Sequence, residues 1–345
     1  MTVRSHTCTS VRSAQLPAFE AKSLKSHTCA SVRIATSLPN WAMSHSTAPL
    51  HRFAMDAMAT TFEIVIRSGD KVYAKSAAMA AFDEVKRIET ELSRFIPSSD
   101  VSQINRLRAG QSLRVGIAAF DCLRLAKAVH AETGGAFDVT IGALMACWRT
   151  EQPSPDDLSA ARARTGMGLL RIDEATHTVG PTVDGLQVDL GSIGKGYAVD
   201  KMVELLREWS VTDALVHAGE SSVSAMGTWD VALRDPQKQT EVLGHLSLYD
   251  RSLSGSGLSL QGQHILDPRT GRPVEGKLAT WALAPSAALS DALSTAFMLM
   301  SASEIERYCA VNPEVSAAVL PTSPSSRLMR FGAWSSFDTP TGLPS

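Results

Sequence analysis

Apolar residues recur three or four positions apart in several long segments of the chain, and this spacing predicts amphipathic helices with one buried face. The spacing is clearest over residues 75–95, 120–132 and 198–209. A further helix is expected over residues 286–301. These segments form the helical part of the predicted fold.

Segments rich in β-branched and aromatic residues predict strands between and after these helices. TTFEIVIR, residues 60–67, is one of them, and residues 186–190 predict a short strand that leads into a glycine-rich stretch. From residue 214 to residue 285 the pattern changes to several short strands separated by turn residues. Because helices and strands mix without a strict βαβ repeat, we expect an α+β fold, a single domain with a mixed, largely antiparallel sheet and flanking helices.

The two ends of the chain have a different composition from this central region. Residues 1–50 contain the near repeat SHTCTSVRSAQLP and SHTCASVRIATSLP, which is rich in Ser, Thr and Arg and has no apolar period. We expect a disordered leader there, or a translation start that in fact lies at Met43 or Met55. Residues 51–320 then form the folded domain, and residues 321–345 form a loose Ser- and Pro-rich tail in which Phe331 and Trp334 are candidates to dock.

Composition and charge exclude several classes of protein. The chain has 345 residues, of which 44% are hydrophobic and 20% charged, as in ordinary soluble globular proteins. Its net charge of -2 gives no basic field for nucleic acid, and no apolar run reaches the length of a transmembrane helix. The five cysteines are scattered without a CxxC pair, and no secretory signal or lipobox is visible. We therefore expect a cytoplasmic protein.

The glycine-rich stretch VDLGSIGKGYAVDKM, residues 188–202, is the first candidate for binding chemistry. It matches neither the P-loop pattern nor GxGxxG, because its glycines have the wrong spacing and no Ser or Thr follows Lys195. A glycine-rich turn before a helix can still bind an anion through backbone N–H groups, and Lys195 would add a full positive charge. A plain strand-to-helix turn with a solvated lysine explains this stretch equally well.

Three further stretches carry polar residues at spacings that suit catalysis or binding. In HILDPRTGRPV, His264 lies three residues before Asp267 and could act as a base, while Arg269 could hold a phosphate. Asp291 and Thr295 share one face of a predicted helix and offer oxygen atoms suited to Mg²⁺. In GGAFD, Asp138 could bind a ligand ring or ribose. Taken singly, each stretch is explained as well by an ordinary turn or a helix-terminal aspartate.

Together and in order, these stretches are more specific than any one of them. The region from His51 to Leu320 resembles the ApbE family of FAD:protein FMN transferases. The resemblance rests on MATTFEI (58–64), LSRFIPSSDVSQINR (92–106), GAFDVTIGAL (135–144), VDLGSIGKGYAVDK (188–201), LVHAGES (215–221), HILDPRTGRPV (264–274) and SDALSTA (290–296).

The resemblance implies an ApbE-like, T-fold-like domain and a specific reaction. FAD would bind with Mg²⁺, and FMN would pass to a Thr or Ser hydroxyl of an acceptor flavoprotein while AMP leaves. His264 would be catalytic. The residues implied to contact FAD are Met58, Ala136, Phe137, Asp138, Asp189, Lys195 and Ile265. Those implied to surround the metal are Ser192, Asp291, Ser294 and Thr295.

The sequence also departs from the family pattern in ways that leave an alternative open. SGSGLSL, residues 254–260, stands where the family usually has SGxY and so lacks the aromatic residue. Glu220 in LVHAGES stands near a habitual aspartate, and GSIGKG replaces GGIAKG. The alternative is a protein that binds FAD, or hydrolyses it to FMN and AMP, without transfer to an acceptor. A purely structural protein is disfavoured because Asp189, Lys195, His264, Asp291 and Thr295 are all retained.

Overall fold

The fold is described from a computed structural model of the chain. It describes residues 32–34, 48–149, 153–238, 241–258, 265–323, 327–334 and 337–338. His264, the predicted catalytic residue, and most of the first 47 residues lie outside the described residues.

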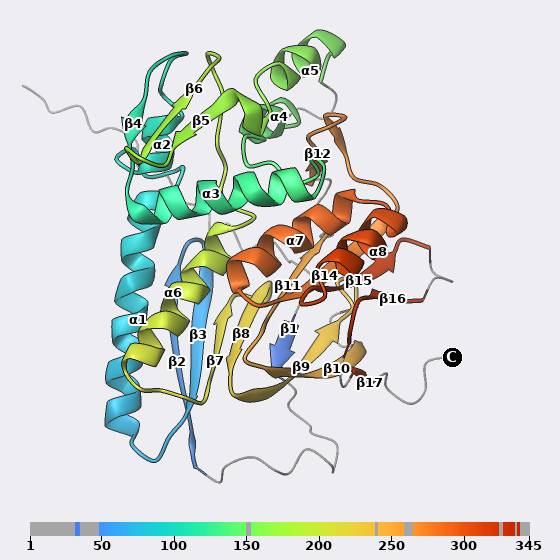
Figure 1. Cartoon of the computed structure of the whole chain (residues 1–345). Helices are drawn as coiled ribbons and strands as arrows, with labels where there is room; N and C mark the ends of the chain where they lie inside the picture. The colour runs from blue at the N-terminus through green and yellow to red at the C-terminus, as the bar shows by residue number, and fades with distance from the viewer. Residues whose placement is uncertain are drawn as a thin grey trace, which may run out of the picture.

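The central feature of the described region is an eight-stranded sheet with the strand order β16-β15-β14-β11-β8-β7-β3-β2. Neighbouring strands in it are antiparallel, so the predicted α+β fold with a largely antiparallel sheet is confirmed (Figure 1). Its strands are β2 (Leu50–Ala57), β3 (Thr60–Arg67), β7 (Ala214–Ala218), β8 (Ser222–Met226), β11 (Ser252–Gly257), β14 (Lys277–Ala284), β15 (Ser316–Pro321) and β16 (Met329–Phe331).

Helices cover one face of this sheet. Successive residues of a strand point toward opposite faces, so every second residue of a strand contacts these helices. On β3, Phe62, Ile64 and Ile66 join the core beneath the helices, together with Phe82 and Val85 of the first helix. These helices are α1 (Lys71–Leu92), α3 (Ile117–Glu132), α6 (Gly194–Glu208), α7 (Ala287–Leu299) and α8 (Ala302–Val311). The four predicted helices correspond to α1, α3, α6 and α7.

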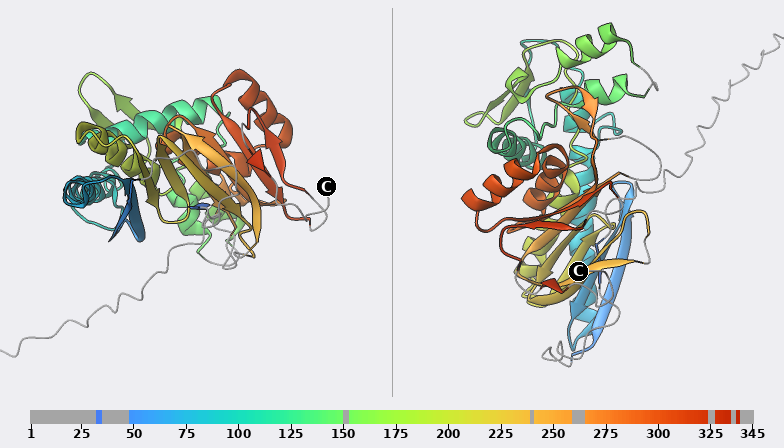
Figure 2. Two further views of the ribbon diagram at one scale, coloured as in Figure 1. Left: turned by 90° about the horizontal axis from the view of Figure 1, so that it is seen from below. Right: turned by 90° about the vertical axis from the view of Figure 1, so that its right-hand side faces the viewer.

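A four-stranded antiparallel sheet packs on the opposite face, with the order β1-β9-β10-β17 among the described residues. A second core joins the two sheets, with Val65 and Leu215 on one side and Trp229 and Val231 on the other. Figure 2 shows the layers from two further directions. The strands are β1 (Val32–Ile34), β9 (Thr228–Arg234), β10 (Val242–Tyr249) and β17 (Phe337–Asp338).

Short strands from both ends of the chain belong to these sheets, in segments that the sequence suggested were unstructured. β1 pairs with β9, β17 pairs with β10, and β16 pairs with β15. Trp334 also docks in the tail, where its indole N–H donates to the carbonyl of Ala317 at 3.1 Å. Two- and three-residue strands have no usable period, so their pairing cannot be read from the local pattern.

Smaller elements form a layer above α3, at the top of Figure 1. A three-stranded sheet has the order β4-β6-β5, and β12 pairs with β13. The elements are α2 (Asp100–Ile104), β4 (Leu113–Arg114), α4 (Gly142–Cys147), α5 (Pro155–Arg162), η1 (Met167–Leu169), β5 (Leu170–Asp173), β6 (Thr178–Pro181), β12 (Leu266–Asp267) and β13 (Arg272–Pro273). No helix in the described part of the chain has the length and apolarity that a membrane crossing requires.

The prediction of a strand over residues 186–190 is wrong. Only an isolated parallel bridge joins Gln187 to Ile141. A side chain takes the place of a strand partner: Asn105 donates to the carbonyl of Val188 at 2.9 Å and accepts from its N–H at 2.6 Å. A side-chain amide that satisfies one backbone unit in both directions leaves no signal in the local pattern.

Candidate active site between helices α6 and α7

The candidate site lies where the first turn of α6 meets the first half of α7. Gly196 of α6 packs directly on the α7 backbone, because a Cβ at this position would lie 2.2 Å from the carbonyl oxygen of Ala287 and 2.8 Å from the Cα of Ala288. Only glycine allows this approach. It brings the N–H of Gly196 to Oδ2 of Asp291, 3.1 Å away.

The glycine-rich stretch is itself the start of α6. The helix begins at Gly194, four residues before the predicted start, because glycines have low helix propensity and hide the first turn from a pattern search. Its N-cap, Ile193, makes no side-chain capping hydrogen bond. A side chain from α7 takes its place, because the carboxylate of Asp291 accepts from the first-turn N–H of Gly196 and faces the partial positive charge of this helix end.

Lys195 adds a full charge at this helix end. Its Nζ donates to the carbonyl of Gly191 at 3.0 Å and lies 3.9 Å from Oδ2 of Asp291. The side chain is 24% exposed, so it is neither buried nor free in solvent. Lysine, helix N-terminus and carboxylate thus share one small region, and this supports the anion-binding interpretation of the stretch over that of a plain turn.

Asp189 holds the turn that precedes α6. Its Oδ1 accepts from the N–H of Gly191 at 2.8 Å, and its Oδ2 forms a 2.6 Å ion pair with Arg94. Arg94 is absent from the predicted site, although it belongs to the LSRF block that supports the resemblance. Ser192 follows in the same turn and is half-buried. The turn therefore has two cations near it, Arg94 and Lys195.

Asp291 is a deeply buried charge, with its side chain 4% exposed. Its Oδ2 accepts from Gly196, whereas no hydrogen bond from the described residues reaches Oδ1. Thr295, one turn later, is half-buried and faces the same region. Ser294 is fully buried, and its hydroxyl donates to the carbonyl of Asp291 at 2.8 Å, so it lies behind Asp291 and Thr295.

These residues fit a divalent cation, although no group of three His, Cys, Asp or Glu side chains that could hold a metal exists in the described ranges. A buried carboxylate with one oxygen unpaired needs additional positive charge nearby, and Lys195 at 3.9 Å supplies only part of it. Mg²⁺ is commonly held by one or two carboxylates, with waters and substrate phosphates completing its shell. Asp291 and the hydroxyl of Thr295 match the protein's share of such a shell.

Charged side chains hold α7 at both of its ends. At the N-terminus, the carboxylate of Asp200 accepts from the N–H groups of Ala287 at 2.6 Å and Ala288 at 2.8 Å. At the C-terminus, Lys277 donates to the carbonyl of Phe297 at 2.6 Å and also to that of Met300. An anion at the start and a cation at the end both complement the helix dipole. Burial raises the pKa of Asp200 to about 6 and lowers that of Lys277 to about 8.

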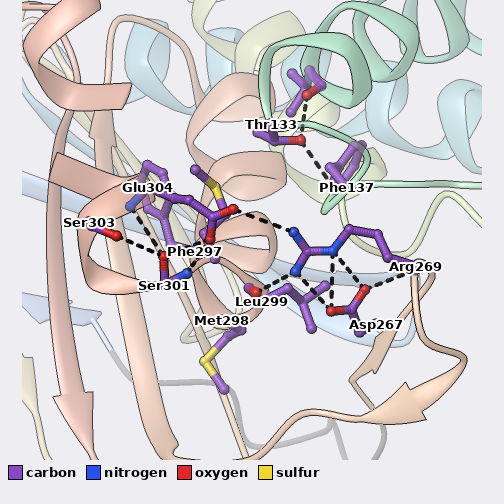
Figure 3. A network of polar contacts seen from close by, with 12 residues as sticks. Thr133, Phe137, Asp267, Arg269, Phe297, Met298, Leu299, Ser301, Ser303 and Glu304 are labelled. Carbon is purple, nitrogen blue, oxygen red and sulfur yellow. Dashed lines mark hydrogen bonds and ion pairs between the residues drawn. The ribbon is translucent and has the colours of Figure 1, made fainter. Parts of the chain in front are cut away.

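Arg269 joins the HILDPRTGRPV loop to the same helix end (Figure 3). Its guanidinium donates to the carboxylate of Asp267 at 2.8 Å and to the carbonyl of Leu299 at 2.7 Å, and it lies 3.8 Å from Glu304. The bond to Asp267 raises the pKa of Arg269 above its usual value. Asp267 is therefore committed to Arg269, and Arg269 is a structural clamp rather than a free phosphate ligand.

The GGAFD block lies beside this loop and beside the turn before α6. Arg269 comes within 3.8 Å of where a Cβ on Gly135 would lie, and the N–H of Asp189 donates to the carbonyl of Val139 at 2.7 Å. The carboxylate of Asp138 accepts two hydrogen bonds from Thr140, one from the N–H of Thr140 at 2.7 Å and one from its hydroxyl at 2.6 Å. It accepts a third from the N–H of Met167 at 3.0 Å. It is thus a turn aspartate here, and its contact with FAD stays a prediction.

The other predicted FAD contacts are mostly apolar. Ala136 and Phe137 are each 1% exposed, and Ile265 packs in a small cluster with Val274 and Met298. Met58 has a positive φ of 50° and donates its N–H to Glu89 at 2.8 Å. Its side chain reaches the first turn of α6, where its Cε lies 3.5 Å from where a Cβ on Gly194 would be. The structure thus brings Met58, Lys195 and Asp291 together at the start of α6, and Ile265 packs on α7 near its C-terminus, while His264 lies outside the described range.

Comparison with known proteins decides the family. The model of the ApbE family matches residues 58–320. The chain belongs to the ApbE family. It is 31% identical over 224 residues to an FAD:protein FMN transferase of Klebsiella pneumoniae, covering 60% of this chain and 71% of that protein. An FAD:protein FMN transferase of Escherichia coli is 29% identical over 227 residues, covering 58% of this chain and 64% of that one.

Solved ApbE structures share the fold. The ApbE protein of Thermotoga maritima superposes with a TM-score of 0.73 at 26% identity, covering 82% of this chain and 97% of that one. The apo form of the flavinyl transferase ApbE of Pseudomonas stutzeri gives 0.72 at 25% identity, covering 82% of this chain and 94% of that one.

Several residues that shape this ApbE site are not apparent from the sequence. Asp200, Lys277 and Asn105 act on backbone groups far away in the chain, and their motifs carry no spacing that would indicate it. Arg94 is in a block that resembles the family, but its partner Asp189 is 95 positions further on. Such long-range pairs become visible only once the fold places them together.

Gly196→Ala tests the close approach of α6 and α7. We expect its methyl group to push the two helices apart and weaken the bond to Asp291, lowering the free energy of unfolding by about 1–3 kcal/mol. Urea unfolding followed by circular dichroism measures this. Gly194→Ala is the matched control, since its Cβ would meet only side-chain atoms at 3.5 Å. Equal stability of the two variants would contradict the proposed constraint.

Asp200→Asn tests the N-terminal anchor of α7. The pKa of Asp200 is raised from 3.8 to about 6, so between these values the folded protein binds a proton more readily than the unfolded chain. The stability that Asp200 contributes is therefore largest near pH 4 and falls as pH rises to about 6. We expect the difference in unfolding free energy between wild type and Asp200→Asn to shrink over that range. A difference that grows with pH would show that the pKa shift has the opposite sign.

Proposed function

We propose that the protein transfers FMN from FAD to a Thr or Ser hydroxyl of an acceptor protein, with release of AMP. The observation that carries this proposal is the buried Asp291, which faces Lys195 and accepts from the N–H of Gly196 in the first turn of α6. That arrangement suits a pyrophosphate with an associated cation. The relatives are named FAD:protein FMN transferases, which gives the substrate class. We assign the same substrate class to this chain because it belongs to the ApbE family.

The reaction breaks a phosphoanhydride bond of FAD and forms a phosphoester bond to the acceptor. The acceptor hydroxyl oxygen attacks the phosphorus of the FMN half, the bond from that phosphorus to the bridging oxygen breaks, and AMP leaves with the bridging oxygen. The hydroxyl proton passes to a base, and we assign this role to His264. Phosphoryl transfer depends mainly on positioning and charge neutralisation. Lys195 and the N-terminus of α6 would stabilise the charge on the pyrophosphate.

The metal would be held by Asp291 and Thr295, with Ser192 facing it from the turn before α6. When bound, Mg²⁺ would neutralise pyrophosphate charge that Lys195 alone does not offset. Ser294, also expected near the metal, fits better as a support for Asp291, because its hydroxyl is fully buried and committed to a backbone carbonyl. Met58, Ala136, Phe137, Asp138, Asp189 and Ile265 are assigned to FAD as the resemblance implies.

A second candidate function is FAD binding, or FAD hydrolysis to FMN and AMP, without transfer to an acceptor. The end of β11 favours it, because residues 254–257 are buried serines and glycines where the family pattern places an aromatic residue. Without that ring, the hold on the flavin or the adenine would be weaker. The two functions share the metal site and differ in whether water or a protein hydroxyl attacks.

In-gel flavin fluorescence distinguishes the two functions. The protein is incubated with FAD, Mg²⁺ and an acceptor that carries a Thr flavinylation motif, and we expect a fluorescent acceptor band and one AMP per flavin transferred. An acceptor with Val in place of that Thr should remain dark. Release of FMN and AMP at equal rates with either acceptor would instead establish hydrolysis.

Asp291→Ala tests the metal site within this function. Loss of the buried carboxylate that accepts from Gly196 should reduce transfer by at least about 100-fold at millimolar Mg²⁺. Asp83→Ala is the control, since Asp83 lies on the exposed face of α1 and pairs there with Lys86. The rate of flavin transfer at several Mg²⁺ concentrations gives the result, and full activity of Asp291→Ala would contradict the assignment.

A further inference from the structure

A chain of three hydroxyl groups joins β11 to the candidate metal site. The hydroxyl of Ser256 on β11 lies 2.8 Å from that of Ser294 and 3.1 Å from that of Thr295, both on α7. Ser256 is 6% exposed and Ser294 is fully buried, whereas Thr295 is half-buried. Ser256 therefore contacts the buried side of Thr295, and the other side of Thr295 faces the candidate metal site.

Counting protons gives the direction of these hydrogen bonds, since each hydroxyl has one hydrogen to donate and two lone pairs to accept. Ser294 donates its hydrogen to the carbonyl of Asp291 at 2.8 Å. In the contact between the two serines, Ser256 must then be the donor. Having given its hydrogen to Ser294, Ser256 can only accept from Thr295. The hydrogen bonds thus run from Thr295 to Ser256, to Ser294 and to the backbone of Asp291.

This direction determines what Thr295 can offer to a ligand. A threonine in a helix often donates to the carbonyl four residues earlier, but the distance from Thr295 to the carbonyl of Asp291 is 3.5 Å, and Ser294 already donates to that oxygen. With its hydrogen held by Ser256, Thr295 has lone pairs left for a cation. A hydroxyl whose hydrogen pointed toward the cation would repel it.

We propose that Ser256 is a positioning residue that holds the hydrogen of the Thr295 hydroxyl and thereby directs the oxygen lone pairs of Thr295 toward a divalent cation at Asp291. The proposal rests on the metal site of the proposed function and adds a residue to it that does not itself touch the metal. Outer partners that orient metal ligands in this way typically contribute 10–100-fold in metal affinity.

The neighbouring serine on the same strand provides a matched control. Ser254 lies two residues before Ser256, on the same face of β11, and its hydroxyl lies 2.7 Å from that of Ser290 on α7. Ser290 in turn donates to the carbonyl of Ala287 at 3.1 Å. Ser254 and Ser290 are both fully buried, so this pair repeats the Ser256–Ser294 contact without a threonine attached.

The test measures Mn²⁺ binding by the electron paramagnetic resonance signal of free Mn²⁺, in the presence of FAD and without an acceptor, corrected for Mn²⁺ bound by FAD alone. Ser256→Ala should raise the Kd for Mn²⁺ by about 10-fold or more. Ser254→Ala should leave that Kd unchanged. Both variants should lower the melting temperature of the metal-free protein by similar amounts, because each removes one buried hydroxyl pair.

Two further variants separate orientation from packing. Ser256→Thr keeps the hydroxyl and should restore Mn²⁺ affinity to within a few-fold of wild type. In a Thr295→Val background, Ser256→Ala should cause no additional loss of Mn²⁺ affinity, because the group that it orients is already absent. An additive loss in the double variant would overturn the positioning role.

The outcomes distinguish this inference from the metal site itself. If Asp291→Ala abolishes Mn²⁺ binding and Ser256→Ala does not weaken it, the role of Ser256 is refuted and the metal site stands. If Ser254→Ala weakens Mn²⁺ binding as much as Ser256→Ala, the effect is general packing and the role of Ser256 is again refuted. If Asp291→Ala leaves Mn²⁺ binding intact, the metal site and the inference fall together.

Discussion

The site depends on one steric constraint, the backbone-to-backbone contact between Gly196 of α6 and Ala287 of α7. The axes of two packed helices normally lie about 8–10 Å apart, because side chains separate the backbones. A glycine at the contact has no side chain and lets the backbones come closer. The approach lets a backbone N–H of α6 reach the buried carboxylate of Asp291. It also brings Lys195, on the same turn, next to that carboxylate. Anion-binding and cation-binding groups therefore come from two helices whose closest approach is at one glycine.

The position of α7 is determined by polar contacts more than by apolar ones. Asp200 binds its first N–H groups, Lys277 and Arg269 bind its last carbonyls, and serines of β11 meet it along its length. Apolar packing is non-directional, so it can bury a helix face without selecting one position along the axis. Directional bonds at both ends and along one side remove that freedom. This precision matters because Asp291 and Thr295 must reach a ligand from neighbouring turns.

Much of the fold could be predicted, because long helices such as α1 and strands such as β3 carry a clear period. The predicted site residues could be named from ordered motifs that resemble the ApbE family, and the structure brings Lys195 and Asp291 of two of these motifs together where α6 meets α7. The features that could not be predicted share one physical property. They depend on contacts between residues far apart in the chain, or they lie in segments without a hydrophobic period. Asn105 in place of a strand partner for Val188, Arg94 beside Asp189, and the early start of α6 at Gly194 all belong to this class. For Asp138 the sequence left a ligand contact and a turn aspartate open, and its partners Thr140 and Met167 support the turn.

The alternating serines of β11 have a consequence for the register between sheet and helix. Ser254 and Ser256 are two residues apart along the strand, whereas their partners Ser290 and Ser294 on α7 are one helical turn apart. Two strand residues span about 6.6 Å and four helix residues about 6 Å, so the two repeats nearly match. If α7 slid by one residue, about 1.5 Å, both pairs would lose alignment together and leave buried hydroxyls unpaired. The two serine pairs therefore select one position of α7 along the sheet, because the strand and helix spacings match only when both pairs are aligned.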